Sequence, residues 1–86
     1  MMELVWQTHA WEDYLYWQKQ DKKALERINE LTKDCQRSSF KGLGKPEPLK
    51  GNYSGCWSRR ITDEHRLIYT VKQERLHILQ CRYHYK

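Results

Sequence analysis

The sequence has little of what metal sites and redox sites are built from. Its 86 residues include only three cysteines, Cys35, Cys56 and Cys81, which lie far apart in the chain. No two of them form a C-x-x-C pair, so the sequence supports neither a zinc site nor a redox motif. We expect buried free thiols, as in proteins of a reducing cytoplasm, and we expect no metal and no cofactor.

Long apolar segments are also missing. Apolar residues make up 38% of the chain, and the mean hydropathy is -1.04. No run of residues is long and apolar enough to span a bilayer, and the N-terminus lacks the apolar segment of a secretion signal. These absences predict a cytoplasmic protein without a membrane segment.

Material for an apolar core is scarce. A chain of 86 residues predicts one domain, residues 1–86, with a core close to the lower limit for independent folding. Four tryptophans and six tyrosines must then supply much of the buried area. A core this small favours stabilisation by a partner or by a second copy of the chain.

Acidic residues are scarce in the second half of the chain. Residues 1–36 carry five lysines and arginines against seven aspartates and glutamates, a net charge of −2. Residues 37–86 carry eleven against four, a net charge of +7. A basic region segregated in this way favours a polyanionic partner such as nucleic acid, although an ordinary solvated surface has the same composition.

The first part of the chain predicts one strand and two helices. Residues 3–6 resemble a short opening strand, and residues 8–20 an amphipathic helix. The apolar face of this helix is expected at positions spaced by three and four residues: Trp11, Tyr14, Leu15 and Gln18. Asp21 is the expected N-cap of a second helix to about residue 36. Its expected apolar face comprises Leu25, Ile28, Leu31 and Cys35.

Residues 38–55 form an expected loop, because they contain both prolines and all four glycines. Pro46 and Pro48 flank Glu47 and push it toward an extended conformation. The loop therefore holds one stiffened carboxylate. The alternative is a rigid connector in which Glu47 is merely solvated.

Three β-like segments follow, at residues 56–61, 66–71 and 76–82, with polar turns between them. Successive hairpins of this kind predict an antiparallel meander. The expected fold class is therefore α+β with the order β-α-α-β-β-β. The two-helix hairpin covers one face of the sheet and leaves the other free.

Side chains alternate between the two faces of a strand. The residues expected under the helices are Leu67, Tyr69, Val71, Leu79 and Cys81. Three polar residues, Arg66, Arg82 and His84, would then line the free face. Leu76 and Ile78 do not fit this alternation, so a bulge or mixed burial stays open.

The loop and the free face together have the residue types that metal-free RNA cleavage needs. A base takes the proton of the ribose 2′-hydroxyl, a cation stabilises the charge on phosphorus, and an acid protonates the leaving 5′-oxygen. Glu47, Arg66 and His84 suit these three roles. The residues expected to contact RNA or its phosphates are Lys45, Lys50, Arg59, Arg60, Arg82 and Tyr85.

Each of these assignments has a plainer alternative. Arg66 has the sequence context of an ordinary solvated strand arginine. His65 and His77 are expected on the surface without a role. Among the histidines, only its position in the terminal segment favours His84.

Five segments together resemble the YoeB (Txe) toxins of the RelE superfamily. They are the Trp11-Glu12-Asp13-Tyr14 motif, the loop 42–50, and residues 57–61, 64–67 and 81–85. The match extends over essentially the whole chain in order. It implies a RelE-like, microbial RNase-like fold and a toxin of a type II toxin–antitoxin pair.

The resemblance also implies an activity and partners. Members of the family are ribosome-dependent endoribonucleases, which cut mRNA in the A site of the 70S ribosome and inhibit translation. By motif, the general base corresponds to Glu47, the phosphate-stabilising arginine to Arg66 and the general acid to His84. The terminal tyrosine corresponds to Tyr85 and a phosphate-contacting lysine to Lys50. The implied partners are a YefM-like antitoxin, operator DNA only through the antitoxin complex, and a second copy in a homodimer.

Two residues depart from the family pattern. Lys86 extends the chain past the aromatic end, and Cys56 stands where a bulky apolar residue is expected. Neither change removes a catalytic group. Two other functions stay open: a non-catalytic ribosome- or RNA-binding inhibitor of translation, and an inactive toxin that acts as a co-repressor.

Overall fold

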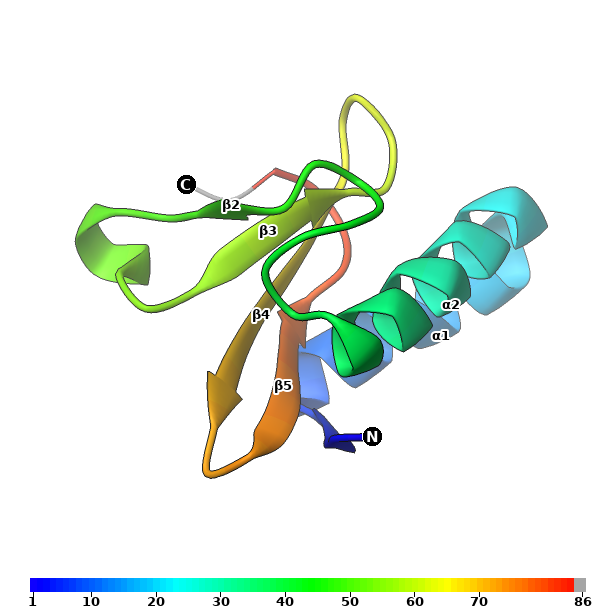
Figure 1. The fold of residues 1–86 in the computed structure, drawn as a ribbon. Helices are drawn as coiled ribbons and strands as arrows, with labels where there is room; N and C mark the ends of the chain where they lie inside the picture. The colour runs from blue at the N-terminus through cyan, green and yellow to red at the C-terminus, as the bar shows by residue number, and fades with distance from the viewer. Residues whose placement is uncertain (85–86) are drawn as a thin grey trace.

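The computed structural model describes residues 1–84 and contains two helices beside a five-stranded sheet (Figure 1). The elements in chain order are β1 (Glu3–Trp6), α1 (Thr8–Gln20), α2 (Lys22–Arg37), β2 (Glu47–Pro48), a 3-10 turn (Gly51–Tyr53), β3 (Trp57–Arg60), β4 (Arg66–Lys72) and β5 (Arg75–Gln80). No helix within residues 1–84 is long and apolar enough to cross a membrane.

The α+β class and the order of the predicted elements are confirmed, and the sheet has one more strand than predicted. The strand order is β1-β5-β4-β3-β2. β1 pairs in parallel with β5 and the other pairs are antiparallel, so the sheet is mixed. The extra strand is β2, in the predicted loop, where Glu47 pairs with Ser58. An edge strand accepts Pro48 because its missing N–H can face away from the ladder.

The second helix is built as its sequence predicts. The carboxylate of Asp21 accepts the backbone N–H groups of Lys23 and Ala24, which confirms Asp21 as the N-cap. The buried residues of α2 are Ala24, Ile28, Leu31, Thr32 and Cys35. They include three of the four residues of the predicted apolar face, while Leu25 is partly buried.

The predicted apolar face of α1 is wrong except at Tyr14, which is partly buried against the core. The buried residues of this helix are Ala10, Asp13 and Trp17, while Trp11 is 46% exposed and Leu15 is 41% exposed. Asp13 is buried because its carboxylate accepts the backbone N–H of Cys81. A buried aspartate gives no apolar signal, so the sequence pattern selected the wrong side of the helix.

A β-bulge explains the broken alternation in the last strand. Tyr69 lies opposite Ile78, and Ile68 lies opposite Gln80, so Leu79 is an extra residue without a partner. Before the bulge, Leu76 and Ile78 face the helices. The prediction that Leu79 packs under the helices is therefore wrong, and the prediction for Cys81, beyond the bulge, is confirmed.

The face of the sheet away from the helices, called the second face below, is not free as predicted. Ser58, Ile68 and Thr70 point to this side, yet they are 2%, 1% and 8% exposed. Thr70 donates its hydroxyl to the carbonyl of Gly55, so the loop before β3 contacts this face. A ligand on the second face would therefore lie over buried side chains, among them Ser58, Ile68 and Thr70.

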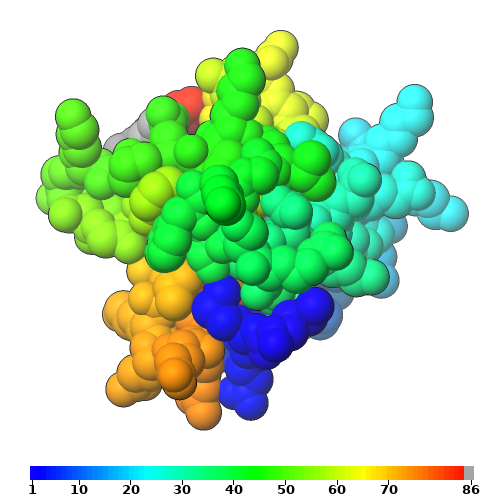
Figure 2. Space-filling view, in the orientation of Figure 1, coloured from blue at the N-terminus to red at the C-terminus, as the bar shows by residue number. Residues whose placement is uncertain are grey.

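Arg59 is a buried structural residue, and the prediction that it contacts phosphate is wrong. Its side chain is 0% exposed and lies on the helix side of β3. Its guanidinium donates to five acceptors: the hydroxyl of Tyr69, a carboxylate oxygen of Asp34, and the carbonyls of Leu43, Ser38 and Lys41. The loop after α2, green in Figure 2, covers the middle of this side of the molecule.

These contacts determine the ionisation of the groups around Arg59. A hydrogen bond from the backbone of Leu43, together with the bond from Arg59, lowers the pKa of Asp34. Burial raises the pKa of Tyr69 to about 12 and the pKa of the Cys35 thiol to about 11. At neutral pH, Arg59 and Asp34 therefore form an ion pair, and Tyr69 and Cys35 beside them are neutral.

We expect Arg59→Met to lower the free energy of unfolding by about 3–5 kcal/mol, because the buried partners of the guanidinium lose their donor. Chemical denaturation measures this loss. The matched control is Arg60→Met, an exposed neighbour on the same strand. Equal stabilities of the two variants would contradict the structural role of Arg59.

We expect the stability contribution of Asp34 to depend on pH. Because its pKa is lower in the folded state, the carboxylate stabilises the fold above the pKa of the unfolded chain and loses this effect as pH falls. The difference in unfolding free energy between the parent and Asp34→Asn should be largest at neutral pH and shrink below about pH 4. Asp63→Asn, in an exposed turn, is the control. A difference that stays constant with pH would rule out this contribution.

Candidate active site on the second face of the sheet

The strand register places the predicted catalytic carboxylate and cation on one face. Glu47 lies opposite Ser58, and Ser58 lies opposite Ile68, so a row of side chains crosses β2, β3 and β4 on the second face. Arg66 is two residues from Ile68 and therefore shares this face. Two strand spacings separate Glu47 from β4, about 10 Å between backbones. A substrate between the two side chains would lie across β3.

Arg66 is held by the turn that precedes it. Its Nη1 atom donates to the carbonyls of Thr62, Asp63 and His65, at 2.6, 2.9 and 3.2 Å. The side chain is 9% exposed, so Arg66 is not an ordinary solvated strand arginine. Within residues 1–84 these bonds use only Nη1, which leaves Nη2 and Nε for an anion.

The C-terminal tail, residues 81–84, is anchored to α1 at its first residue. The N–H of Cys81 donates to Asp13 at 3.1 Å, and the carbonyl of Cys81 accepts the indole N–H of Trp17 at 2.7 Å. Both backbone polar groups of Cys81 are thus satisfied by side chains of one helix. Burial, with a smaller contribution from the charge of Asp13, raises the pKa of the Cys81 thiol.

The next residue turns toward the helix. The Arg82 guanidinium lies 3.5 Å from the ring centre of Tyr16 and 4.5 Å from that of Tyr83. Arg82 therefore stacks on aromatic rings, one of them on α1, which differs from the prediction that it lines the free face. It is half-buried, and its contact with RNA stays a prediction.

His65 holds the following residue and is not the surface histidine that the sequence predicts. Tyr83 donates its N–H to Nδ1 of His65 at 2.7 Å, and its carbonyl accepts the N–H of Arg66 at 3.0 Å. The side chain of His65 is 13% exposed and packs edge-on against Trp17. His77 is also half-buried, so its predicted surface position is wrong as well.

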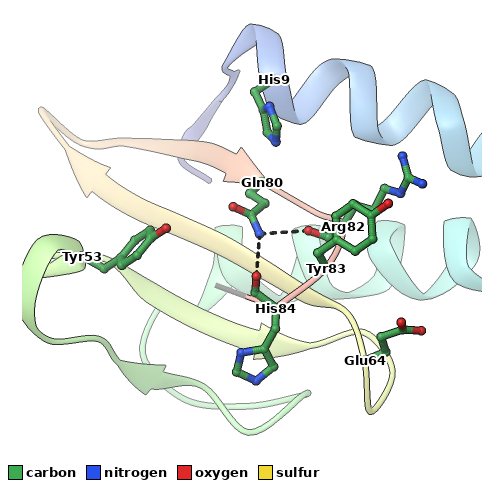
Figure 3. Close-up of a pocket in the computed structure, with 7 residues that line it drawn as sticks. All are labelled: His9, Tyr53, Glu64, Gln80, Arg82, Tyr83 and His84. Carbon is green, nitrogen blue, oxygen red and sulfur yellow. Dashed lines mark hydrogen bonds between the residues drawn. The ribbon is translucent and has the colours of Figure 1, made fainter. Parts of the chain in front are cut away.

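A cavity of about 570 Å³ opens beside this tail (Figure 3). The residues that line it are His9, Tyr53, Glu64, Gln80, Arg82, Tyr83 and His84. Gln80 donates to the carbonyls of Arg82 and His84, at 2.9 and 3.5 Å. In Figure 3 the imidazole of His84 points away from Gln80. The tail therefore forms one wall of the cavity and presents an exposed imidazole at its margin.

The structure thus brings two of the three predicted catalytic residues onto adjoining segments. The bond between the Arg66 N–H and the Tyr83 carbonyl places Arg66 beside the residue before His84. Glu47 is exposed on β2, across β3 on the same face. Lys45, Lys50 and Arg60 are exposed, as phosphate contacts require. Tyr85 lies outside the described residues.

The sequence pattern missed three residues that shape this site: Asp13, Trp17 and His65. The side chain of each forms a hydrogen bond with a backbone group of the tail, and Trp17 also packs against His65. Contacts between a side chain and a distant backbone group leave no periodic signal. Asp13 and His65 lie within the segments that carry the family resemblance, and this position in the sequence could have indicated that they matter for the site.

Comparisons with known proteins agree with the fold. A family model described as the YoeB-like toxin of bacterial type II toxin-antitoxin systems matches residues 6–85. Toxin YoeB of Escherichia coli (strain K12) is 60% identical over 84 residues, which cover 98% of this chain and 100% of that protein. The YoeB/ParE toxin from Agrobacterium tumefaciens has a TM-score of 0.95 and 52% identity, with 98% of this chain and 100% of that chain covered.

Two solved structures of Staphylococcus aureus YoeB are also similar. One is a YoeB–YefM complex, with a TM-score of 0.89, 45% identity and 99% of both chains covered. The other is a YoeB dimer, with a TM-score of 0.89, 47% identity and 98% of both chains covered. The predicted family is confirmed: the chain belongs to the YoeB toxin family of bacterial type II toxin–antitoxin systems.

Proposed function

We propose that the protein is a metal-independent endoribonuclease toxin that cuts mRNA in the A site of the 70S ribosome and thereby inhibits translation. The observation that carries the proposal is the backbone bond between Arg66 and Tyr83, which holds the segment of His84 beside Arg66. Glu47 faces the same side of the sheet. A base and a cation thus share one face, and the proposed acid lies on the segment that adjoins the cation.

The proposed reaction is attack of the ribose 2′-oxygen on the adjacent phosphorus. Glu47 accepts the proton of the 2′-hydroxyl as the new P–O bond forms. Arg66, through Nη2 and Nε, stabilises the negative charge that develops on the phosphoryl oxygens. His84 donates a proton to the 5′-oxygen as the P–O5′ bond breaks. The products are a 2′,3′-cyclic phosphate and a 5′-hydroxyl end.

Exposed cations and rings around this centre would hold the RNA. Lys45, Lys50 and Arg60 surround the row from Glu47 to Arg66 and are exposed, so they can pair with flanking phosphates. Arg82 would contact RNA from the wall of the cavity, and Tyr85 would stack on a base. The charge of +7 in residues 37–86 attracts the polyanion to this half of the molecule.

The separation of the catalytic groups supports a requirement for the ribosome. Glu47 and β4 are two strand spacings apart, about 10 Å, so free RNA must be held in one bent conformation to contact both. The decoding site of a ribosome holds a codon in a defined conformation and would supply this order. The ribosome then contributes orientation and the protein contributes proton transfer.

The proposed partners follow from the relatives. Staphylococcus aureus YoeB has been solved with YefM and as a dimer. By this likeness we propose that the present protein is cytoplasmic, binds a YefM-like antitoxin and forms a homodimer. We further propose that it contacts operator DNA only through the antitoxin complex. The cavity beside the tail is the surface that an inhibitory antitoxin segment would cover.

We expect Glu47→Gln and His84→Ala each to lower the cleavage rate by about 10²- to 10⁴-fold, the usual contribution of a general base or acid. Primer extension on mRNA from a translating extract would show the loss of discrete cuts at A-site codons. Glu74→Gln, in the exposed turn between β4 and β5, should cut like the parent. End analysis of the parent's products should give 5′-hydroxyl termini.

Three outcomes would overturn the proposal or part of it. Cleavage by His84→Ala at the parent's rate would exclude His84 as the acid. Inhibition of translation by the parent with full-length mRNA, unchanged in Glu47→Gln, would instead indicate a non-catalytic inhibitor that occupies the ribosome. Binding of operator DNA with the antitoxin but without growth arrest would indicate an inactive toxin kept as a co-repressor.

A further inference from the structure

Tyr83 has a backbone conformation that a tyrosine rarely adopts. Its φ is +63°, in the left-handed region. A residue stays there only when its surroundings hold it, and such residues cluster at functional sites. Its side chain is 55% exposed, so burial of the ring does not hold the residue in place.

The two backbone bonds of Tyr83 supply this hold. The carbonyl accepts the N–H of Arg66, which extends the pairing of β4 past the end of β5. The N–H donates to Nδ1 of His65, a side-chain acceptor, at 2.7 Å. The second bond is therefore the one that depends on the identity of a side chain.

His65 is well placed to act as this acceptor. Because Nδ1 accepts an N–H, it carries the lone pair, and the ring proton lies on Nε2, 3.4 Å from a carboxylate oxygen of Glu64. The ring edge packs against Trp17 with centroids 4.7 Å apart. The backbone N–H of His65 donates to the hydroxyl of Thr62. The imidazole is thus fixed by its own turn and by α1.

Trp17 connects the two anchor points of the tail. The same indole that packs on His65 donates its N–H to the carbonyl of Cys81. Helix α1 therefore orients the tail directly at Cys81 and indirectly at Tyr83. These contacts are separate from Glu47, Arg66 and His84, the groups proposed to act on the RNA.

We propose that His65 is a positioning residue of the active site: its Nδ1 holds Tyr83 in the left-handed conformation and thereby directs His84 toward the phosphate beside Arg66. The inference rests on the proposed function. If Tyr83 returned to negative φ, the next residue would move by several ångström, because consecutive Cα atoms are about 3.8 Å apart. A displacement of this size is enough to disable an acid that must reach one oxygen.

The test compares His65→Phe with His65→Asn. Phenylalanine keeps an aromatic ring against Trp17 but has no acceptor, whereas the side-chain oxygen of asparagine lies near the position of Nδ1 and can accept the Tyr83 N–H. Rates are measured by primer extension on programmed ribosomes, with kcat and KM separated. Thermal unfolding of each variant reports on the fold.

We expect His65→Phe to lower kcat by about 10- to 100-fold with KM nearly unchanged, the signature of misplaced rather than missing chemistry. His65→Asn should recover activity to within about threefold of the parent, because it restores the acceptor. Equal activity of the folded Phe variant and the parent would overturn the proposal. Equal losses in both variants would also overturn it, because the acceptor would then not matter.

A measurement on the unmodified protein keeps the proposal independent of activity and of variant folding. Nitrogen-15 NMR of the imidazole should show Nδ1 of His65 unprotonated at neutral pH, and the amide of Tyr83 should be protected from hydrogen exchange. A protonated Nδ1 or an unprotected amide would overturn the positioning role even if the protein cuts mRNA. If the parent cuts no mRNA but Nδ1 of His65 is unprotonated and the Tyr83 amide is protected, the proposed function is wrong. The hydrogen bond between Tyr83 and His65 is then still supported.

Discussion

The buried guanidinium of Arg59 is the contact on which the loop between α2 and β3 depends. It joins the end of α2, the first part of the loop and β4 through bonds to Asp34, three loop carbonyls and Tyr69. A backbone bond from Arg60 to Gly44 fixes the next part of the loop. Glu47 follows three residues later, in β2. The carboxylate proposed as the base is thus placed by interactions on the opposite side of the sheet.

The acid proposed for the same reaction is placed by a different set of contacts. Residues 81–84 have no regular structure, and their backbone bonds go to side chains of α1, of the turn before β4 and of Gln80, and to the backbone of Arg66. The proposed site therefore combines a rigid central strand, which carries Arg66, with two flanking segments that are tethered at a few points.

The sequence predicted what periodicity and local rules encode. Asp21 followed by the apolar spacing of α2 predicts a capped helix, and the prolines around Glu47 predict extended backbone; both are confirmed. It did not predict burial of Arg59 or His65, because a buried cation or imidazole looks like a surface one until its distant partners are known. Leu76 and Ile78 did not fit the predicted alternation, which indicated an irregularity in the last strand. The pattern did not show that Leu79 is the extra residue. Residue type and position suggested the candidate catalytic residues, the family resemblance assigned their roles by motif, and the structure supplied their neighbours.

The central claim is that Glu47, Arg66 and His84 act on one phosphodiester. The most direct measurement is a structure of the protein on a 70S ribosome whose A-site codon carries a 2′-O-methyl group at the attacking ribose, which prevents cleavage. We expect the Glu47 carboxylate beside the 2′-oxygen, the Arg66 guanidinium on the phosphate and the His84 imidazole at about 3 Å from the 5′-oxygen. An imidazole that lies across the protein from this phosphate, with the other two groups in place, would contradict it.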